Sequence, residues 1–122
     1  MSYLKLIKKD NCIDYEDASN APMSILGMFL LSDVRCSGSN FFRKWVDDDR
    51  YMGGGGNYSS LEKKGERIII MPEWAEEEDP FLEMPKQSFI HILDEWAKVC
   101  KEQPREVMIT REGDQFIFEK KF

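Results

Sequence analysis

Residues 85–104 read PKQSFIHILDEWAKVCKEQP, and this stretch decides the fold because it is the strongest helix pattern in the chain. Its apolar side chains recur at i, i+4, i+7, i+8 and i+11, which places them on one face of an α-helix. They are Phe89, Leu93, Trp96, Ala97 and Cys100, with Ile92 and Val99 widening the stripe. Pro85 suits the first turn and Pro104 stops the helix. The pattern predicts one long helix, ending at Gln103, that packs its apolar face on a sheet.

Strand and turn patterns flank this helix on both sides. Downstream, Glu106–Arg111 and Gln115–Lys120 are separated by a short Gly-containing turn, which predicts a hairpin. Upstream, Tyr58–Leu61 and Glu66–Met71 predict a second hairpin. The Glu66–Met71 strand is apolar on both faces, so we expect it to lie centrally in the sheet.

The N-terminal part of the chain has weaker patterns. Tyr3–Lys9 alternates as a strand near a sheet edge, and Asp10–Pro22 has the turn and cap residues of a loop. Ser24–Leu31 predicts a buried strand, with a core helix as the alternative, and Phe41–Asp47 predicts a short amphipathic helix. The predicted fold is therefore α+β: an antiparallel sheet of about six strands, with one long and one short helix packed on one face, in a single domain, 1–122.

Composition limits the classes of function. A chain of 122 residues with 42% hydrophobic and 12% aromatic residues can bury a core and fold as one domain. Its formal net charge of −6 disfavours direct binding to nucleic acid, whose phosphates attract basic residues. A basic protein partner fits better.

The three cysteines, Cys12, Cys36 and Cys100, are an odd set without a Cys-x-x-Cys pair or a histidine cluster. We expect free thiols, no metal and no cofactor. Reduced thiols and an N-terminus without a leader pattern predict a cytoplasmic protein. The longest apolar run, Ile25–Leu31, is far below the ~20 residues that a membrane-spanning helix needs, so no membrane association is expected.

The acidity is concentrated in one predicted loop, Pro72–Met84. Within it, Glu73–Glu83 carries six carboxylates and no basic residue, and the 17 carboxylates elsewhere match the 17 Lys and Arg. Carboxylates around an aromatic side chain can occupy a cationic cleft, and interface hot spots favour Trp and Tyr. A second acidic run, Asp47–Asp49, lies beside Tyr51 at a helix C-terminus, where the helix dipole disfavours negative charge. The candidate partner-binding residues are Trp74, Glu76, Glu77, Glu78, Asp79, Asp47, Asp48, Asp49 and Tyr51.

Other chemistry has less support in the sequence. Gly53–Gly56 lacks the Lys and Ser or Thr of a phosphate loop and is interpreted as a flexible connector. His91, the single histidine, falls on the polar helix face, away from Cys100. The carboxylate run lacks the spacing of a calcium loop. Two alternatives stay open. One is a small enzyme or metal-binding domain using the acidic cluster, and the other is a generic adaptor subunit with a solvated acidic loop.

Two segments carry a resemblance to a known class of proteins. GNYSSL at 56–61 precedes a hairpin, and FIHILDEW at 89–96 lies in a helix followed by Pro104 and EVMIT at 106–110, with Gly113 in the last turn. Over roughly residues 55–119 the chain resembles the small acidic immunity proteins of bacterial polymorphic toxin systems, including contact-dependent growth inhibition. The resemblance implies a non-enzymatic inhibitor that binds a cognate toxin domain, often a nuclease, and blocks its active site. It implies no contact residues, and we expect a monomer or weak homodimer.

Overall fold

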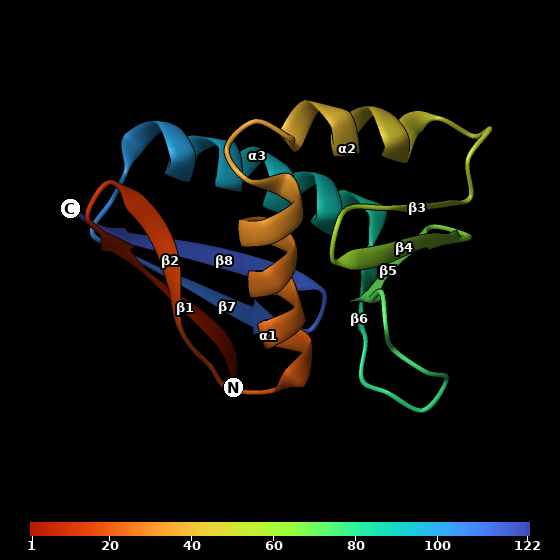
Figure 1. Cartoon of the computed structure of the whole chain (residues 1–122), viewed down its shortest axis with the longest axis horizontal. Helices are drawn as coiled ribbons and strands as arrows, with labels where there is room; N and C mark the ends of the chain where they lie inside the picture. The colour runs from red at the N-terminus through yellow and green to blue at the C-terminus, as the bar shows by residue number, and fades with distance from the viewer.

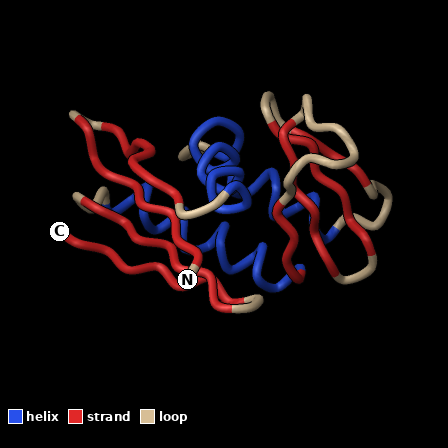
Figure 2. Tube along the Cα trace, turned by 90° about the horizontal axis from the view of Figure 1, so that it is seen from below, coloured by secondary structure: helices blue, strands red, loops and turns tan.

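Two four-stranded antiparallel sheets flank a layer of helices in the computed structural model, which describes residues 1–122 (Figures 1 and 2). The α+β class is confirmed, but the single sheet of about six strands with two helices is wrong. There are eight strands and three α-helices. The hairpin upstream of the long helix and the hairpin downstream of it join different sheets, a distinction that local strand patterns do not carry.

The first sheet has the order β2-β1-β7-β8. Its strands are β1 (Ser2–Lys9), β2 (Cys12–Ala18), β7 (Glu106–Glu112) and β8 (Gln115–Lys121). The loop predicted over Asp10–Pro22 is therefore wrong, and β1 lies inside the sheet instead of near its edge. The β2 strand was missed because most of its side chains are exposed and three of its seven residues are acidic, without the alternation of a half-buried strand. Asp10, with φ of 55°, makes the turn between β1 and β2.

The second sheet has the order β3-β4-β5-β6. Its strands are β3 (Gly53–Gly55), β4 (Ser59–Lys64), β5 (Arg67–Pro72) and β6 (Leu82–Pro85). The prediction that the strand at Glu66–Met71 is central is confirmed, since β5 lies between β4 and β6. Because β6 falls inside the predicted acidic loop, that loop is shorter, covering residues 73–81.

The glycine run is a strand, so its interpretation as a flexible connector is wrong. Gly53–Gly55 pairs with β4, and the indole Nε1 of Trp45 donates a hydrogen bond to the carbonyl of Gly53 at 3.1 Å. A Cβ on Gly54 would lie 2.7 Å from that same Nε1. Glycine is needed here for the close approach of a backbone to an aromatic ring.

The buried segment after β2 is helical, so the strand predicted over Ser24–Leu31 is wrong and the core-helix alternative is right. Helix α1 (Ala21–Met28) continues into a π-helical turn, η1 (Phe29–Val34). The side chain of Asn20 caps α1 by accepting the backbone N–H of Met23 at 3.0 Å. Buried residues lie on more than one side of this segment, so its sequence shows no helical periodicity.

The other helices agree with the sequence. They are α2 (Ser39–Asp47) and α3 (Lys86–Glu102), and α3 confirms the predicted long helix to within one residue at each end. Pro85 is the N-cap residue of α3, and Gln103 ends it in the left-handed conformation. From α3, Phe89, Ile92, Leu93, Trp96 and Val99 enter the core, whereas the predicted core residue Ala97 is exposed.

Cys36 and Cys100 form a disulfide, so the prediction of three free thiols is wrong for this pair. Cys12 is the free cysteine, and it is exposed. The bridge joins positions separated by 64 residues, and a closed loop of that size stabilises a fold by about 4 kcal/mol in the chain-entropy account. Because disulfides are rare in reducing compartments, this bridge removes the support that three reduced thiols gave to a cytoplasmic location. No helix has both the length and the apolar character to cross a membrane.

Candidate functional site

The loop at residues 73–81 joins β5 to β6 and projects from one end of the second sheet (Figure 1). Its backbone is ordered by hydrogen bonds: Glu73 N–H donates to the carbonyl of Tyr58 at 2.9 Å, and Asp79 N–H donates to that of Glu76 at 3.0 Å. The Glu76 N–H donates in turn to Asp79 Oδ2 at 2.8 Å. The loop is thus a pair of turns with a defined shape, and Asp79 helps to build it.

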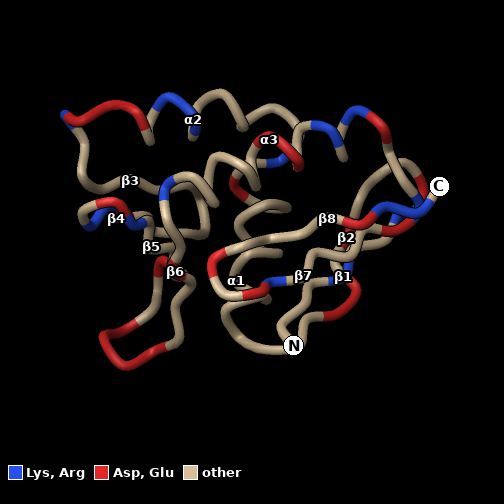
Figure 3. Tube along the Cα trace, turned by 180° about the vertical axis from the view of Figure 1, so that it is seen from behind, with Lys and Arg blue, Asp and Glu red and all other residues tan.

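The carboxylates of this loop have no cationic partner within the chain. None of the nine ion pairs in the structure includes Glu73 or any residue of Glu76–Asp79. All five side chains are exposed. The trace coloured by charge shows acidic residues at the far end of the loop (Figure 3). Their negative charge is therefore directed to solvent and can attract a basic partner.

Two apolar grooves border the loop, one on each side. The first, which we call the Trp74 groove, lies between the loop and α1 and has a volume of about 360 Å³. The second, the Phe81 groove, lies against β5 and has a volume of about 310 Å³. Trp74 is 68% exposed and Phe81 is 45% exposed. The loop is therefore an acidic ridge with an aromatic side chain at the entrance to each groove.

The second acidic run lies at the opposite end of the same strands. Gly53, which follows this run closely, pairs with Glu62 near the β4–β5 turn, whereas Pro72, which leads into the loop, pairs with Ser59 at the other end of β4. Figure 3 shows the two acidic segments well apart. The structure does not bring Asp47–Asp49 and the loop together into one surface.

Asp48, the middle residue of that run, is bound to its neighbours. Its carboxylate accepts hydrogen bonds from the Arg50 backbone N–H at 3.1 Å and from Arg50 Nε and Nη2 at 2.9 and 2.7 Å. These bonds lower the pKa of Asp48 from 3.8 to about 2. The Asp48 carbonyl also accepts a bond from Lys63 Nζ at 2.7 Å, and Lys63 is only 4% exposed.

Lys63 connects the run to the core. Its ammonium lies 4.6 Å from the centre of the Trp45 ring, a cation–π arrangement. Asp47 and Asp49 are exposed, and Tyr51 is 56% exposed beneath the Arg50 guanidinium. Of the predicted residues in this region, Asp48 has a clear structural role.

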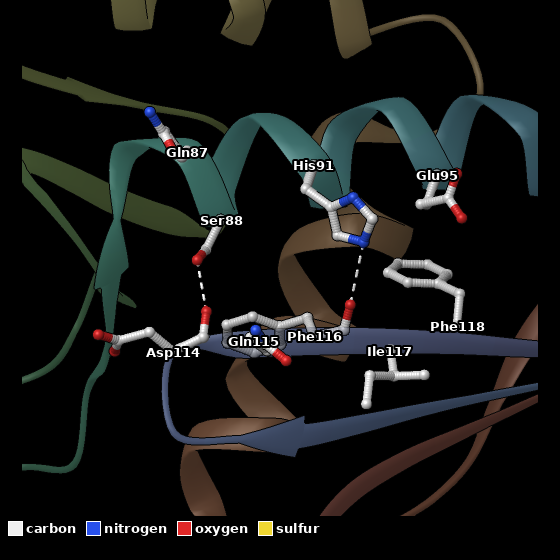
Figure 4. A pocket seen from close by; sticks show the side chains of 9 residues that line it. All are labelled: Gln87, Ser88, His91, Glu95, Asp114, Gln115, Phe116, Ile117 and Phe118. Atoms are coloured by element: carbon white, nitrogen blue, oxygen red, sulfur yellow. Dashed lines mark hydrogen bonds between the residues drawn. The ribbon is translucent and has the colours of Figure 1, made fainter.

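A cavity of about 500 Å³ lies between α3 and the edge strand β8 (Figure 4). Here His91 Nε2 donates to the carbonyl of Phe116 at 3.0 Å, because a carbonyl can only accept. The Ser88 hydroxyl donates to the carbonyl of Asp114. Both side chains fasten α3 to the β7–β8 hairpin, and neither meets the other as a nucleophile and base would. Cys100, the other group considered with His91, is bonded to Cys36.

Charged side chains also join the two sheets, which the sequence did not indicate. Arg67 of β5 pairs with Glu83 of β6 at 2.6 Å and with Asp114 of the β7–β8 turn at 3.2 Å. Arg111 donates to the carbonyl of Glu83 at 2.7 Å. Glu83 therefore helps to join the two sheets, unlike the carboxylates of the loop. No three His, Cys, Asp or Glu side chains gather as ligands for a metal ion.

The α1 wall of the Trp74 groove was absent from the sequence-based site. Ser24, Ile25 and Met28 line it, and all three lie in the segment that was predicted to be a strand. The signal that could have found the helix was Asn20 followed by Pro22, a cap residue and a first-turn proline.

Comparison of the chain with protein-family models, with curated proteins and with solved structures gave no match. What the fold and the site define is an α+β protein of two sheets that presents an ordered acidic ridge with an exposed tryptophan.

Proposed function

We propose that this chain is a non-enzymatic inhibitor of the immunity-protein class, and that the loop at 73–81 binds a basic surface on a cognate toxin domain. The observation that carries the proposal is Trp74, 68% exposed among carboxylates that have no cation of their own in the chain. Tryptophan is a frequent interface anchor, and unpaired carboxylates gain most from a basic partner.

The shape of the loop favours insertion into a cleft over pairing at a sheet edge. The ridge projects beyond the strands and has apolar grooves on both sides, so a partner can enclose it and bury Trp74 and Phe81 together. A cleft that binds phosphates is basic, which makes a nuclease domain a suitable target. Charge attraction of this kind can raise association rates by one to three orders of magnitude at low salt.

The test is binding to the protein encoded immediately upstream, measured by calorimetry at two or more salt concentrations. The loop variant combines Glu76→Gln, Glu77→Gln, Glu78→Gln and Asp79→Asn with Trp74→Ala. The matched control, Asp47→Asn with Asp49→Asn, removes exposed carboxylates at the other end of the sheet.

We expect the loop variant to bind about 100-fold more weakly and with a smaller salt dependence, and the control to stay within about threefold of wild type. Equal affinity and equal salt dependence of the wild type and the loop variant would show that the loop is a solvated segment of an adaptor subunit.

A further inference from the structure

The Trp74 groove differs from the Phe81 groove and from the cavity beside His91 in the charges around it. Its walls are mostly apolar, with Ile25 and Met28 of α1 on one side and Trp74 and Pro80 of the loop on the other. Asp79 lies at its rim, and no Lys or Arg lines it. The groove therefore combines an apolar interior with negative charge at its edge.

The Phe81 groove, on the other side of the loop, has a cation of its own. Lys64 lines it together with Glu76, Glu77 and Asp79, which borders both grooves, so a positive group from outside would meet a like charge there. In the cavity beside His91, the carboxylate of Glu95 is paired with Lys98 at 2.9 Å, and the pKa of Glu95 is lowered by that contact. Among these three cavities, the Trp74 groove alone has a rim carboxylate and no cation beside it.

Asp79, which lines the Trp74 groove, has one free carboxylate oxygen. Asp79 Oδ2 accepts the N–H of Glu76 within the loop, while Oδ1 has no hydrogen-bond partner in the chain. The bond at Oδ2 fixes the orientation of the carboxylate, so Oδ1 is held in place as an acceptor.

We propose that the Trp74 groove binds one arginine side chain of the basic partner. Its aliphatic stem packs between Trp74 and Met28, and its guanidinium stacks on the indole and donates to Asp79 Oδ1. This inference rests on the proposed function, because it names the group by which that partner is recognised.

Arginine fits this site better than other side chains. Its planar guanidinium stacks on aromatic rings and is more weakly hydrated than the ammonium of lysine, so it loses less on entering an apolar groove. A volume of about 360 Å³ is near the lower end of the range for ligand pockets, which suits one long side chain. An apolar side chain would bury the same walls but leave the Asp79 carboxylate without a cation.

The test uses three short probes and needs no toxin: acetyl-Gly-Arg-Gly-amide, the same peptide with lysine, and the same peptide with citrulline, a neutral isostere of arginine. The readout is the indole N–H signal of Trp74 in nitrogen–proton NMR spectra. Trp45 and Trp96 donate their indole N–H groups to the carbonyls of Gly53 and Arg35, so their signals serve as internal references.

We expect the arginine peptide to shift the Trp74 signal with a dissociation constant on the order of millimolar, the lysine peptide to bind at least about threefold more weakly, and citrulline to cause no saturable shift. Equal shifts from arginine and citrulline, or no shift from arginine, would overturn the proposal. Equal binding of arginine and lysine would indicate diffuse charge attraction and would overturn it as well.

Two variants test the position of the bound side chain. Asp79→Asn keeps an acceptor for the Glu76 N–H but removes the charge, and Ser24→Trp fills the groove from the exposed face of α1 while the carboxylates stay. Both should abolish the arginine-specific shift, whereas Asp47→Asn should leave it unchanged.

An arginine shift that persisted in Asp79→Asn would contradict the assignment even if Ser24→Trp failed to fold. The outcome is separable from that of the binding experiment with the upstream protein. If the arginine peptide did not bind but the loop variant still weakened binding to the partner, the arginine site would be ruled out and the proposed function would stand.

Discussion

In the run Asp47–Asp49, the carboxylate of Asp48 accepts hydrogen bonds from Arg50, and its backbone carbonyl accepts one from Lys63. In the run Glu76–Asp79, no carboxylate is paired with a cation. Both runs contain consecutive acidic residues and both lie near an exposed aromatic side chain, Tyr51 in one case and Trp74 in the other. In sequence they are therefore alike. In the structure the first is partly built into the fold and the second is directed outward.

The difference explains an acidic run at an unfavourable place. Negative charge at the C-terminus of α2 opposes the helix dipole. Asp48 is the C-cap residue of that helix, and its bonds to Arg50 offset the dipole. In the loop, Asp79 stabilises a turn, but Glu76, Glu77 and Glu78 have no comparable structural reason for their charge, and the proposed function is placed there for that reason. Four predictions test this contrast, from the largest expected effect to the smallest.

Gly54→Ala should lower the free energy of unfolding by about 3 kcal/mol, the upper part of the range for overpacking. The new Cβ would lie 2.7 Å from Trp45 Nε1, and the indole is also held by its bond to Gly53. Urea unfolding followed by fluorescence gives the value, with Glu77→Ala in the loop as the control. If both variants unfolded at the same urea concentration, the strand after Asp47–Asp49 would not be packed on the core.

Lys63→Met should lower the free energy of unfolding by about 2 kcal/mol, because it removes a buried hydrogen bond and a cation–π contact. The donor is Nζ at 2.7 Å from the Asp48 carbonyl, and the ring is that of Trp45. Lys64→Met, at the exposed neighbouring position, is the matched control and should change stability by less than about 0.5 kcal/mol. Similar effects of the two variants would show that the contacts of Lys63 with Asp48 and Trp45 do not stabilise the fold.

Asp48→Asn should remove one component of acid sensitivity. Since the folded state lowers the pKa of Asp48 from 3.8 to about 2, the stabilisation from its charge is present above about pH 4 and is lost as the pH falls toward 2. The stability difference between wild type and variant should therefore shrink over that interval. Chemical denaturation at a series of acidic pH values measures it, and Arg50→Gln should give the same profile. A constant difference would rule out the Asp48–Arg50 contact as its source.

Neutralising Glu76, Glu77 and Glu78 to Gln should change the free energy of unfolding by less than about 0.5 kcal/mol, in the stabilising direction at low salt, because like charges repel. Thermal unfolding at low and high salt measures this small effect. A clear loss of stability would show that these carboxylates support the fold, which would weaken the case for a binding role.

The comparison also shows how far the sequence predicts this site. Trp74 and the carboxylates of Glu76–Asp79 could be named from the acidic run in the sequence, and they are exposed in the structure. The Trp74 groove could not be named, because its α1 wall lies far from the loop in sequence and was predicted to be a strand. The separation of the two acidic runs likewise depends on the pairing of β3 with β4.

For the fold, elements with a strong local pattern were predicted correctly. Helix α3 has a helical apolar stripe between two prolines, and the hairpins have alternation and turn residues. The misassigned elements lack such signals: α1 is apolar on several sides, β2 is almost wholly exposed, and β3 consists of glycine. In each case the conformation follows from contacts with distant residues.

The sequence by itself determined the class of the fold, the long helix, the net charge of −6 and its concentration in one segment. These are properties of composition and short-range periodicity, which act within a few residues. Tertiary structure alone decided that there are two sheets, that Cys36 meets Cys100, and that one acidic run is bound by the fold while the other is free. Those outcomes depend on which distant segments pack together, and packing is decided by the whole core at once.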